Sequence, residues 1–269
     1  MKKVLLCTWI ILATMIGAGI LALPKAFYET GLIFSLIIMF LTALVMYISS
    51  QILIKLELFK KNIKGLPGLM EVYFGERAKL FTIIIFTLSI YFTVFAYLSA
   101  IYESIKNYFN PYSFLLIIFL LNSFIVYPEK YSIEIFSSYF TIFRIAFIII
   151  LLFYAISIGL TKPQIKIFPN NFFSVASFFA ISVFAFSFFN IIPSLKVFSN
   201  NEKELMLSVK LALILGFLIY LAFSIVFSSE KEIATLNFGI LTDVLTMIFV
   251  ISPYIMLSLI HISEPTRPY

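Results

Sequence analysis

Two glycines near the N-terminus, Gly17 and Gly19, lie in an uncharged run, Val4 to Pro24, that is long enough to cross a bilayer as a helix. Glycine is a weak helix former, so a membrane helix that carries this pair is expected to break there. The backbone groups released by a break inside the membrane need partners from protein, water or a ligand. The pair therefore predicts binding through backbone groups rather than catalysis by side chains.

A broken helix offers two opposite partial charges at one point. The first half ends in carbonyl groups that attract an ammonium group or a cation, and the second half begins with N–H groups that attract a carboxylate. An α-amino acid carries both charges on one carbon, so it matches this pair of helix ends without a charged side chain. The residues that we predict to bind substrate here are Thr14, Met15, Ile16, Gly17, Ala18, Gly19 and Ile20.

A second interruption, FAFSFFNIIPSL from Phe184 to Leu195, lies five apolar segments after the first. Ser187, Asn190 and Pro193 predict an unwound hinge, because a polar amide inside the membrane needs a partner. A simple proline kink is the alternative. Backbone carbonyls at this hinge are expected to complete the amine side of the site. The residues concerned are Phe184, Ala185, Phe186, Ser187 and Asn190.

These residues need long apolar helices to position them, and the composition is suited to such helices. Of the 269 residues, 62% are hydrophobic and 12% are charged, which is more apolar than a soluble core requires. The predicted fold class is an all-α polytopic membrane protein, with one transporter domain over residues 1–256. Its eight apolar segments span roughly 4–28, 32–56, 80–105, 112–128, 138–160, 172–198, 207–228 and 239–260. A short helix within residues 69–74 is expected on the membrane surface.

The basic residues indicate how the chain is oriented. The net charge is +6, and most Lys and Arg residues flank the apolar segments on the side that also carries the N-terminus. This bias predicts a protein of the cytoplasmic (plasma) membrane with its N-terminus in the cytoplasm. The expected partners are the lipid bilayer and a small-molecule amino acid. Nucleic acid is not expected, because the basic residues do not line one face.

The two interruptions also predict an internal repeat. The first and sixth segments cross the membrane in opposite directions, and paired interruptions in corresponding positions of two halves are typical of inverted-repeat transporters. Each half would then hold five helices, whereas the second half here stops in its third. Residues 257–269 resemble the translation of a sequencing adapter, so we expect a non-native tail and assign no role to His261. We also expect that these 269 residues alone do not transport.

Other chemistries find little support in the sequence. Gly17, Gly19 and Ala22 match a dinucleotide-binding pattern, but no strand precedes them and no carboxylate follows about 20 residues later. Nucleophilic serine, zinc and phosphate-loop motifs are missing, so we predict no enzyme, no catalytic or metal-binding residues and no cofactor beyond a coupling ion. A single cysteine, Cys7, excludes a disulfide framework within the chain.

Arg144 lies in the fifth apolar segment, where a centred charge costs about 2.5–3.5 kcal/mol on insertion scales. One interpretation is a fixed cation that fills a sodium-like site or senses the charge of the substrate. The other is a side chain that reaches the cytoplasmic interface, only six residues from Ser138 at the start of the segment. We favour the second interpretation.

The sequence GAGILALPKAF from Gly17 to Phe27, followed by Gly31, resembles the first helix of the amino acid/auxin permease family, within the amino acid–polyamine–organocation superfamily. FAFSFFNIIPSL resembles the sixth helix of that family, and FVISPYI, Phe249 to Ile255, is similar to its eighth. The resemblance implies a LeuT-like fold, a five-plus-five inverted repeat with helices 1 and 6 broken. It also implies symport of an amino acid with H⁺ or Na⁺. Sodium-coupled relatives often carry Asn at the position of Ala13, so the proton is slightly favoured.

The predicted function is secondary active transport of an amino acid, of a neutral kind, by alternating access. An ion channel or an inorganic-ion carrier built on the same broken helices is the alternative. The two differ in a measurable way, because a permease binds a zwitterion saturably whereas a channel conducts without one.

Overall fold

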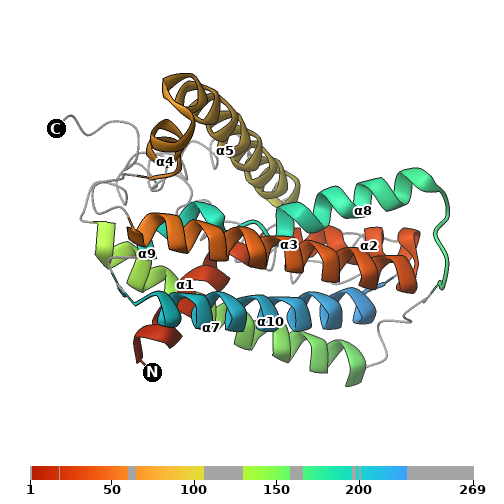
Figure 1. The fold of residues 1–269 in the computed structure, drawn as a ribbon. Coiled ribbons are helices and arrows are strands. Elements are labelled where there is room, and N and C mark those ends of the chain that lie inside the picture. Colours follow the sequence, from red (N-terminus) through yellow and green to blue (C-terminus); the bar gives the residue numbers. More distant parts are fainter. Residues whose placement is uncertain are drawn as a thin grey trace.

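The structure is a computed structural model that describes residues 2–17, 19–59, 65–105, 130–157, 166–195, 198–199 and 201–228 (Figure 1). Every regular element within these ranges is a helix, as the apolar composition predicts. In chain order the helices are α1 (Lys2–Met15), α2 (Gly19–Thr30), α3 (Leu32–Phe59), α4 (Gly65–Phe74), α5 (Glu76–Ile105), α7 (Lys130–Ser157), α8 (Phe172–Ala185), η1 (Phe189–Ile191), α9 (Ile192–Leu195) and α10 (Glu202–Val226).

Three of the described helices are long and apolar enough to cross a membrane: Leu32–Leu56, Glu76–Ala96 and Glu202–Val226. The pair α1 and α2 qualifies as a fourth span if it is counted as one helix bent by 64°. These elements agree with the apolar segments expected from the sequence. Two further expected segments, 112–128 and 239–260, lie outside the described residues, as do Phe249–Ile255 and the tail 257–269.

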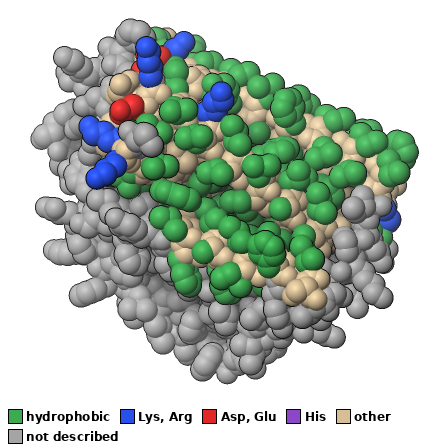
Figure 2. All heavy atoms as spheres, turned by 90° about the horizontal axis from the view of Figure 1, so that it is seen from below, with side chains coloured by type: hydrophobic (Ala, Val, Ile, Leu, Met, Phe, Trp, Pro, Cys, Tyr) green, Lys and Arg blue, Asp and Glu red, His purple; other side chains and the backbone are tan. Residues whose placement is uncertain are grey.

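The outer surface of the bundle is apolar over most of its length. In the view of Figure 2, charged side chains gather near one end and hydrophobic side chains cover most of the remaining described surface. Phe40 and Val45 of α3 and Leu218 of α10 are among the large apolar residues that are more than half exposed. Such a continuous apolar surface is costly in water and is favourable against lipid.

The broken pair α1 and α2 lies inside the bundle. Residues on several sides of α1, such as Cys7, Ile10, Ile11 and Leu12, are fully buried, as expected for a helix that is apolar all round. α1 packs against α10 and α7, α2 packs against α8 and α10, and α3 covers α8 and α10. α4 packs against α5, and this pair stands to one side of the other helices in Figure 1.

The turn between α2 and α3 depends on Gly31. Its φ of +80° lies in the left-handed region, which glycine adopts without steric cost. A Cβ atom at this position would lie 2.7 Å from the backbone of Phe168. Two backbone hydrogen bonds join the same regions: Leu32 donates to the Lys166 carbonyl at 2.7 Å, and Asn170 donates to the Glu29 carbonyl at 2.9 Å. The segment before α8 is therefore fixed to the end of α2.

We predict that Gly31→Ala destabilises the protein more than Gly75→Ala. Both glycines have a positive φ, so both variants carry a strain of about 1–2 kcal/mol, but a Cβ atom at Gly75 meets no atom within 4 Å. The contact with Phe168 adds about 1–3 kcal/mol at Gly31. The apparent melting temperatures of the two variants in detergent measure the difference. Equal shifts would contradict the close packing at Gly31.

Candidate substrate-binding site

The first helix break lies where the glycine pair predicts it. α1 ends at Met15 and α2 begins at Gly19, and the helix axes change direction by 64° between them. Ile16 and Gly17 form the bend, and Ala18 lies outside the described residues. Ile20 donates to the Gly17 carbonyl at 3.3 Å, which is long for a backbone hydrogen bond.

The second break lies just after α8. The helix ends at Ala185, the chain leaves helical geometry over residues 186–188, and the short η1 and α9 follow. Pro193 lies in the first turn of α9, where its missing N–H removes no helical hydrogen bond. The interruption therefore precedes the proline, and a simple proline kink does not describe it. Ser187 lies within the nonhelical stretch and Asn190 in η1.

The fold brings the two breaks together. A Cβ atom on Gly19 would lie 3.1 Å from the Cα atom of Ala185 and 3.2 Å from the Phe184 ring. The start of α2 therefore approaches the end of α8 at a distance that leaves almost no room for a side chain on Gly19. Two stretches that are more than 160 residues apart in the sequence form one buried region.

Arg144 is buried at this region, so the favoured prediction that it reaches the cytoplasmic interface is wrong. Its side chain is 0% exposed and donates to the Ile16 carbonyl at 2.6 Å and the Ala13 carbonyl at 3.1 Å. It also donates to the Thr141 hydroxyl at 2.8 Å. The physical reason is the length of α7, which begins at Lys130 rather than Ser138 and therefore carries Arg144 near its midpoint.

Tyr220 of α10 is a second polar side chain at the breaks, and it is not among the residues predicted from the sequence. Its hydroxyl lies 2.6 Å from the Met15 carbonyl oxygen and 2.9 Å from the Ala185 carbonyl oxygen, and the residue is fully buried. The only available signal was a tyrosine inside an apolar helix, and the chain has 15 tyrosines. A buried tyrosine hydroxyl usually has a partner, but the sequence does not tell which tyrosine is buried.

The predicted binding residues thus surround the two breaks, although several of their backbone groups already have protein donors. The Ile16 carbonyl accepts a hydrogen bond from Arg144, and the carbonyls of Met15 and Ala185 share the Tyr220 hydroxyl as a donor. A carbonyl oxygen has two lone pairs, so each of these groups has capacity for a second donor. A substrate-binding role stays a prediction for all of the residues named: Thr14, Met15, Ile16, Gly17, Ala18, Gly19, Ile20, Phe184, Ala185, Phe186, Ser187 and Asn190.

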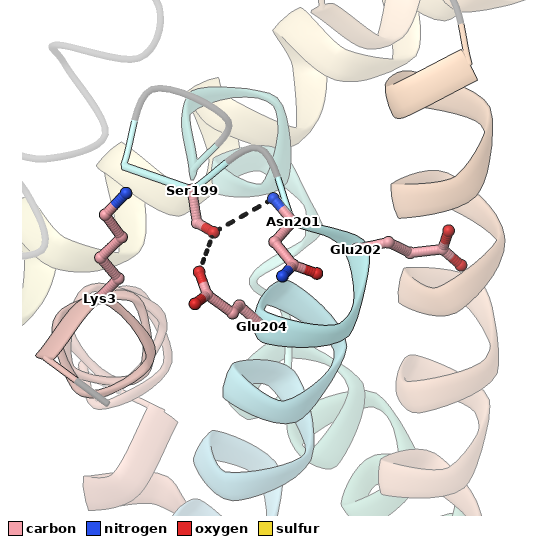
Figure 3. Close-up of a pocket in the computed structure, with 5 residues that line it drawn as sticks. All are labelled: Lys3, Ser199, Asn201, Glu202 and Glu204. Atoms are coloured by element: carbon pink, nitrogen blue, oxygen red, sulfur yellow. Dashed lines mark hydrogen bonds between the residues drawn. The ribbon is translucent and has the colours of Figure 1, made fainter.

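A polar hollow with a volume of about 580 Å³ lies at the N-terminal end of α10, away from the predicted binding residues (Figure 3). Its lining consists of Lys3, Ser199, Asn201, Glu202 and Glu204. Ser199 donates to the Glu204 carboxylate at 2.5 Å, and the Asn201 side chain accepts from the Lys203 N–H at 3.0 Å. In Figure 3 Glu202 points away from the Ser199–Glu204 pair. These contacts stabilise the start of the helix, where carboxylates also interact favourably with the helix dipole.

Long apolar helices and a lipid-compatible surface define an all-helical integral membrane protein, and two helix breaks lie buried inside it. The chain belongs to the tryptophan/tyrosine permease family, whose model matches residues 1–230. A permease is thus supported, but not the amino acid/auxin permease family that the motifs resemble. The family points to a transporter rather than an enzyme, as the sequence predicts.

One curated relative is the tyrosine-specific transport system 1 of Haemophilus influenzae. It is 27% identical over 220 residues, which cover 78% of this chain and 53% of the relative. The chain therefore spans about half the length of the curated relative that it matches. No solved structure matches the chain.

The contact between Gly19 and Ala185 gives a direct test of the candidate site. We predict that Gly19→Leu weakens binding of an α-amino acid at the breaks by about tenfold or more, because the larger side chain forces the two breaks apart. Ala22→Leu is the matched control, since it adds the same side chain to an exposed position of the same helix. Binding of a panel of radiolabelled amino acids to the purified variants measures the effect, and membrane fractionation checks that both insert. An unchanged affinity in Gly19→Leu would argue against a site at the breaks.

Proposed function

We propose that the chain is part of a secondary active transporter for neutral amino acids of the aromatic kind, with tyrosine as the first substrate to test. The observation that carries this proposal is the meeting of the two helix breaks at Gly19 and Ala185. Opposed helix ends at one buried point match the two charges of an amino acid. The name of the Haemophilus relative adds support for tyrosine within this class.

The proposed architecture is a LeuT-like five-plus-five inverted repeat in which α1 with α2, and α8 with α9, are the broken first and sixth helices. The broken pairs and their juxtaposition support it, because irregular backbone inside a membrane protein is tolerated where it is buried in protein or lines a cavity. Transport would proceed by alternating access around the breaks. The N-terminus is proposed to lie in the cytoplasm, on the basis of the positive-inside bias.

Arg144 supports a proton rather than sodium as the coupling ion. Its guanidinium group already supplies a positive charge to the carbonyls of Ala13 and Ile16, where the first helix half ends. Carbonyl oxygens at such a helix end attract cations, and arginine remains charged at any physiological pH. A sodium ion bound to the same oxygens would be repelled by this fixed charge. The side chain of Ala13 offers no oxygen ligand.

Tyrosine uptake into vesicles tests the proposed function directly. We expect saturable uptake of L-tyrosine by the longest gene product that contains this chain, with competition by tryptophan and phenylalanine and stimulation by an inward proton gradient. Failure to bind or transport any amino acid, together with ion conductance in the absence of substrate, would contradict a permease and favour a channel.

The assignment of Arg144 predicts how uptake depends on sodium. Replacing sodium by choline should leave tyrosine uptake by the unmodified protein unchanged. Arg144→Gln should abolish uptake, because two backbone carbonyls then lose a charged donor, and Arg144→Lys should retain only part of it, since lysine lacks the planar array of donors. Lys210→Gln, which removes an exposed cation from α10, is the control. Uptake that requires sodium in the unmodified protein would contradict the assignment.

A further inference from the structure

Tyr220 joins the two helix breaks through one oxygen atom. Met15 is the last residue of α1 and Ala185 is the last residue of α8, and the carbonyls of both contact the Tyr220 hydroxyl, at 2.6 Å and 2.9 Å. The ring is held in place by an edge-on contact with Phe186, with centroids 5.1 Å apart. A single side chain on α10 thus contacts the ends of two helices that are remote in sequence.

The chemistry of the hydroxyl makes this contact unusual. The last carbonyls of a helix have no partner within the helix, and in an apolar interior they need a donor from elsewhere. A tyrosine hydroxyl has one hydrogen, so it donates a strong bond to only one of the two oxygens at a time. The position of that hydrogen is therefore sensitive to any other donor that approaches either carbonyl.

The same contact fixes the position of α1. Near its other end, the Ser208 hydroxyl of α10 lies 3.1 Å from the Val4 carbonyl oxygen and 2.8 Å from the Glu204 carbonyl oxygen of its own helix. A Cβ atom on Gly216 of α10 would lie 2.6 Å from the Met15 Cε atom, so the end of the Met15 side chain packs directly against this glycine. α1 therefore lies along α10, and Tyr220 extends this attachment to the end of α8.

We propose that Tyr220 is a positioning residue that couples the two breaks to substrate binding. When the ammonium group of an amino acid donates to one of the two carbonyls, the hydroxyl donates fully to the other, so both helix ends remain satisfied while the substrate is held between them. Binding and the attachment of α1 to α8 thereby depend on each other. This inference rests on the proposed transport function but assigns a residue that lies outside the broken helices.

The test uses Tyr220→Phe, which keeps the ring and removes the hydroxyl, in the longest gene product that contains this chain. Because one hydrogen bond is lost, we expect the KM for L-tyrosine uptake to rise about two- to tenfold. Tyr47→Phe is the matched control, because it removes the same hydroxyl from a half-buried tyrosine on α3. It should leave KM unchanged. A fall in kcat with an unaltered KM would overturn the proposal, since it would indicate a general loss of folded protein.

A second readout does not require transport. Cys7 of α1 is fully buried, so its alkylation by a membrane-permeable maleimide, followed by mass spectrometry of its peptide, reports how often α1 leaves α10. Tyr220→Phe should raise the alkylation rate about two- to tenfold, and L-tyrosine should slow alkylation in the unmodified protein more than in the variant. Equal rates and equal responses to L-tyrosine would overturn the proposal.

The two readouts separate the possible failures. No binding or uptake of any amino acid by the unmodified protein contradicts the proposed function, whereas normal uptake with a normal KM in Tyr220→Phe contradicts the role of Tyr220 alone. If Tyr220→Phe does not fold, 3-fluorotyrosine at position 220 keeps the size of the side chain and strengthens its hydroxyl as a donor. Slower Cys7 alkylation in that variant would support the proposal, and an unchanged rate would overturn it.

Discussion

Backbone groups released inside an apolar bundle must find hydrogen-bond partners, and this constraint governs the centre of the structure. The two helix breaks release carbonyl groups at Met15, Ile16 and Ala185. Arg144 and Tyr220 donate to them from α7 and α10, which both pack against α1. The irregular backbone is stable because long helices on both sides carry polar side chains to it.

The remaining parts of the described fold follow from this arrangement. Other helices surround most of α1 and α2, which keeps the broken region away from lipid. Most of the exposed large apolar residues fall on α3, α5, α7, α8 and α10 instead. Gly19 permits close approach to α8, and Gly31 turns the chain into α3 while the segment before α8 packs against it. The proposed binding region holds the charged side chain of Arg144, whose guanidinium group is already paired with backbone carbonyls, so we propose a neutral rather than an acidic substrate.

The positions of both breaks were predictable because they follow from local chemistry: glycines in a membrane helix, and polar residues in an otherwise apolar one. The environment of Arg144 was not predictable, because the depth of its side chain in the bundle depends on where α7 begins. The helix extends about two turns before Ser138, through polar residues that the apolar pattern does not include. Tyr220 was beyond sequence reasoning, since its role depends on the packing of α10 against two distant helix ends. The permease class was recognised from motifs, whereas the particular family required comparison along most of the chain.

A substrate-bound structure, determined with L-tyrosine on the longest gene product that contains this chain, tests the central claim most directly. We expect the ammonium group to lie within hydrogen-bonding distance of a backbone carbonyl at the break between α1 and α2 or at the end of α8. The carboxylate should face the first N–H groups of α2. Tyrosine bound elsewhere, for example in the hollow beside Lys3, with both breaks unoccupied, would contradict it.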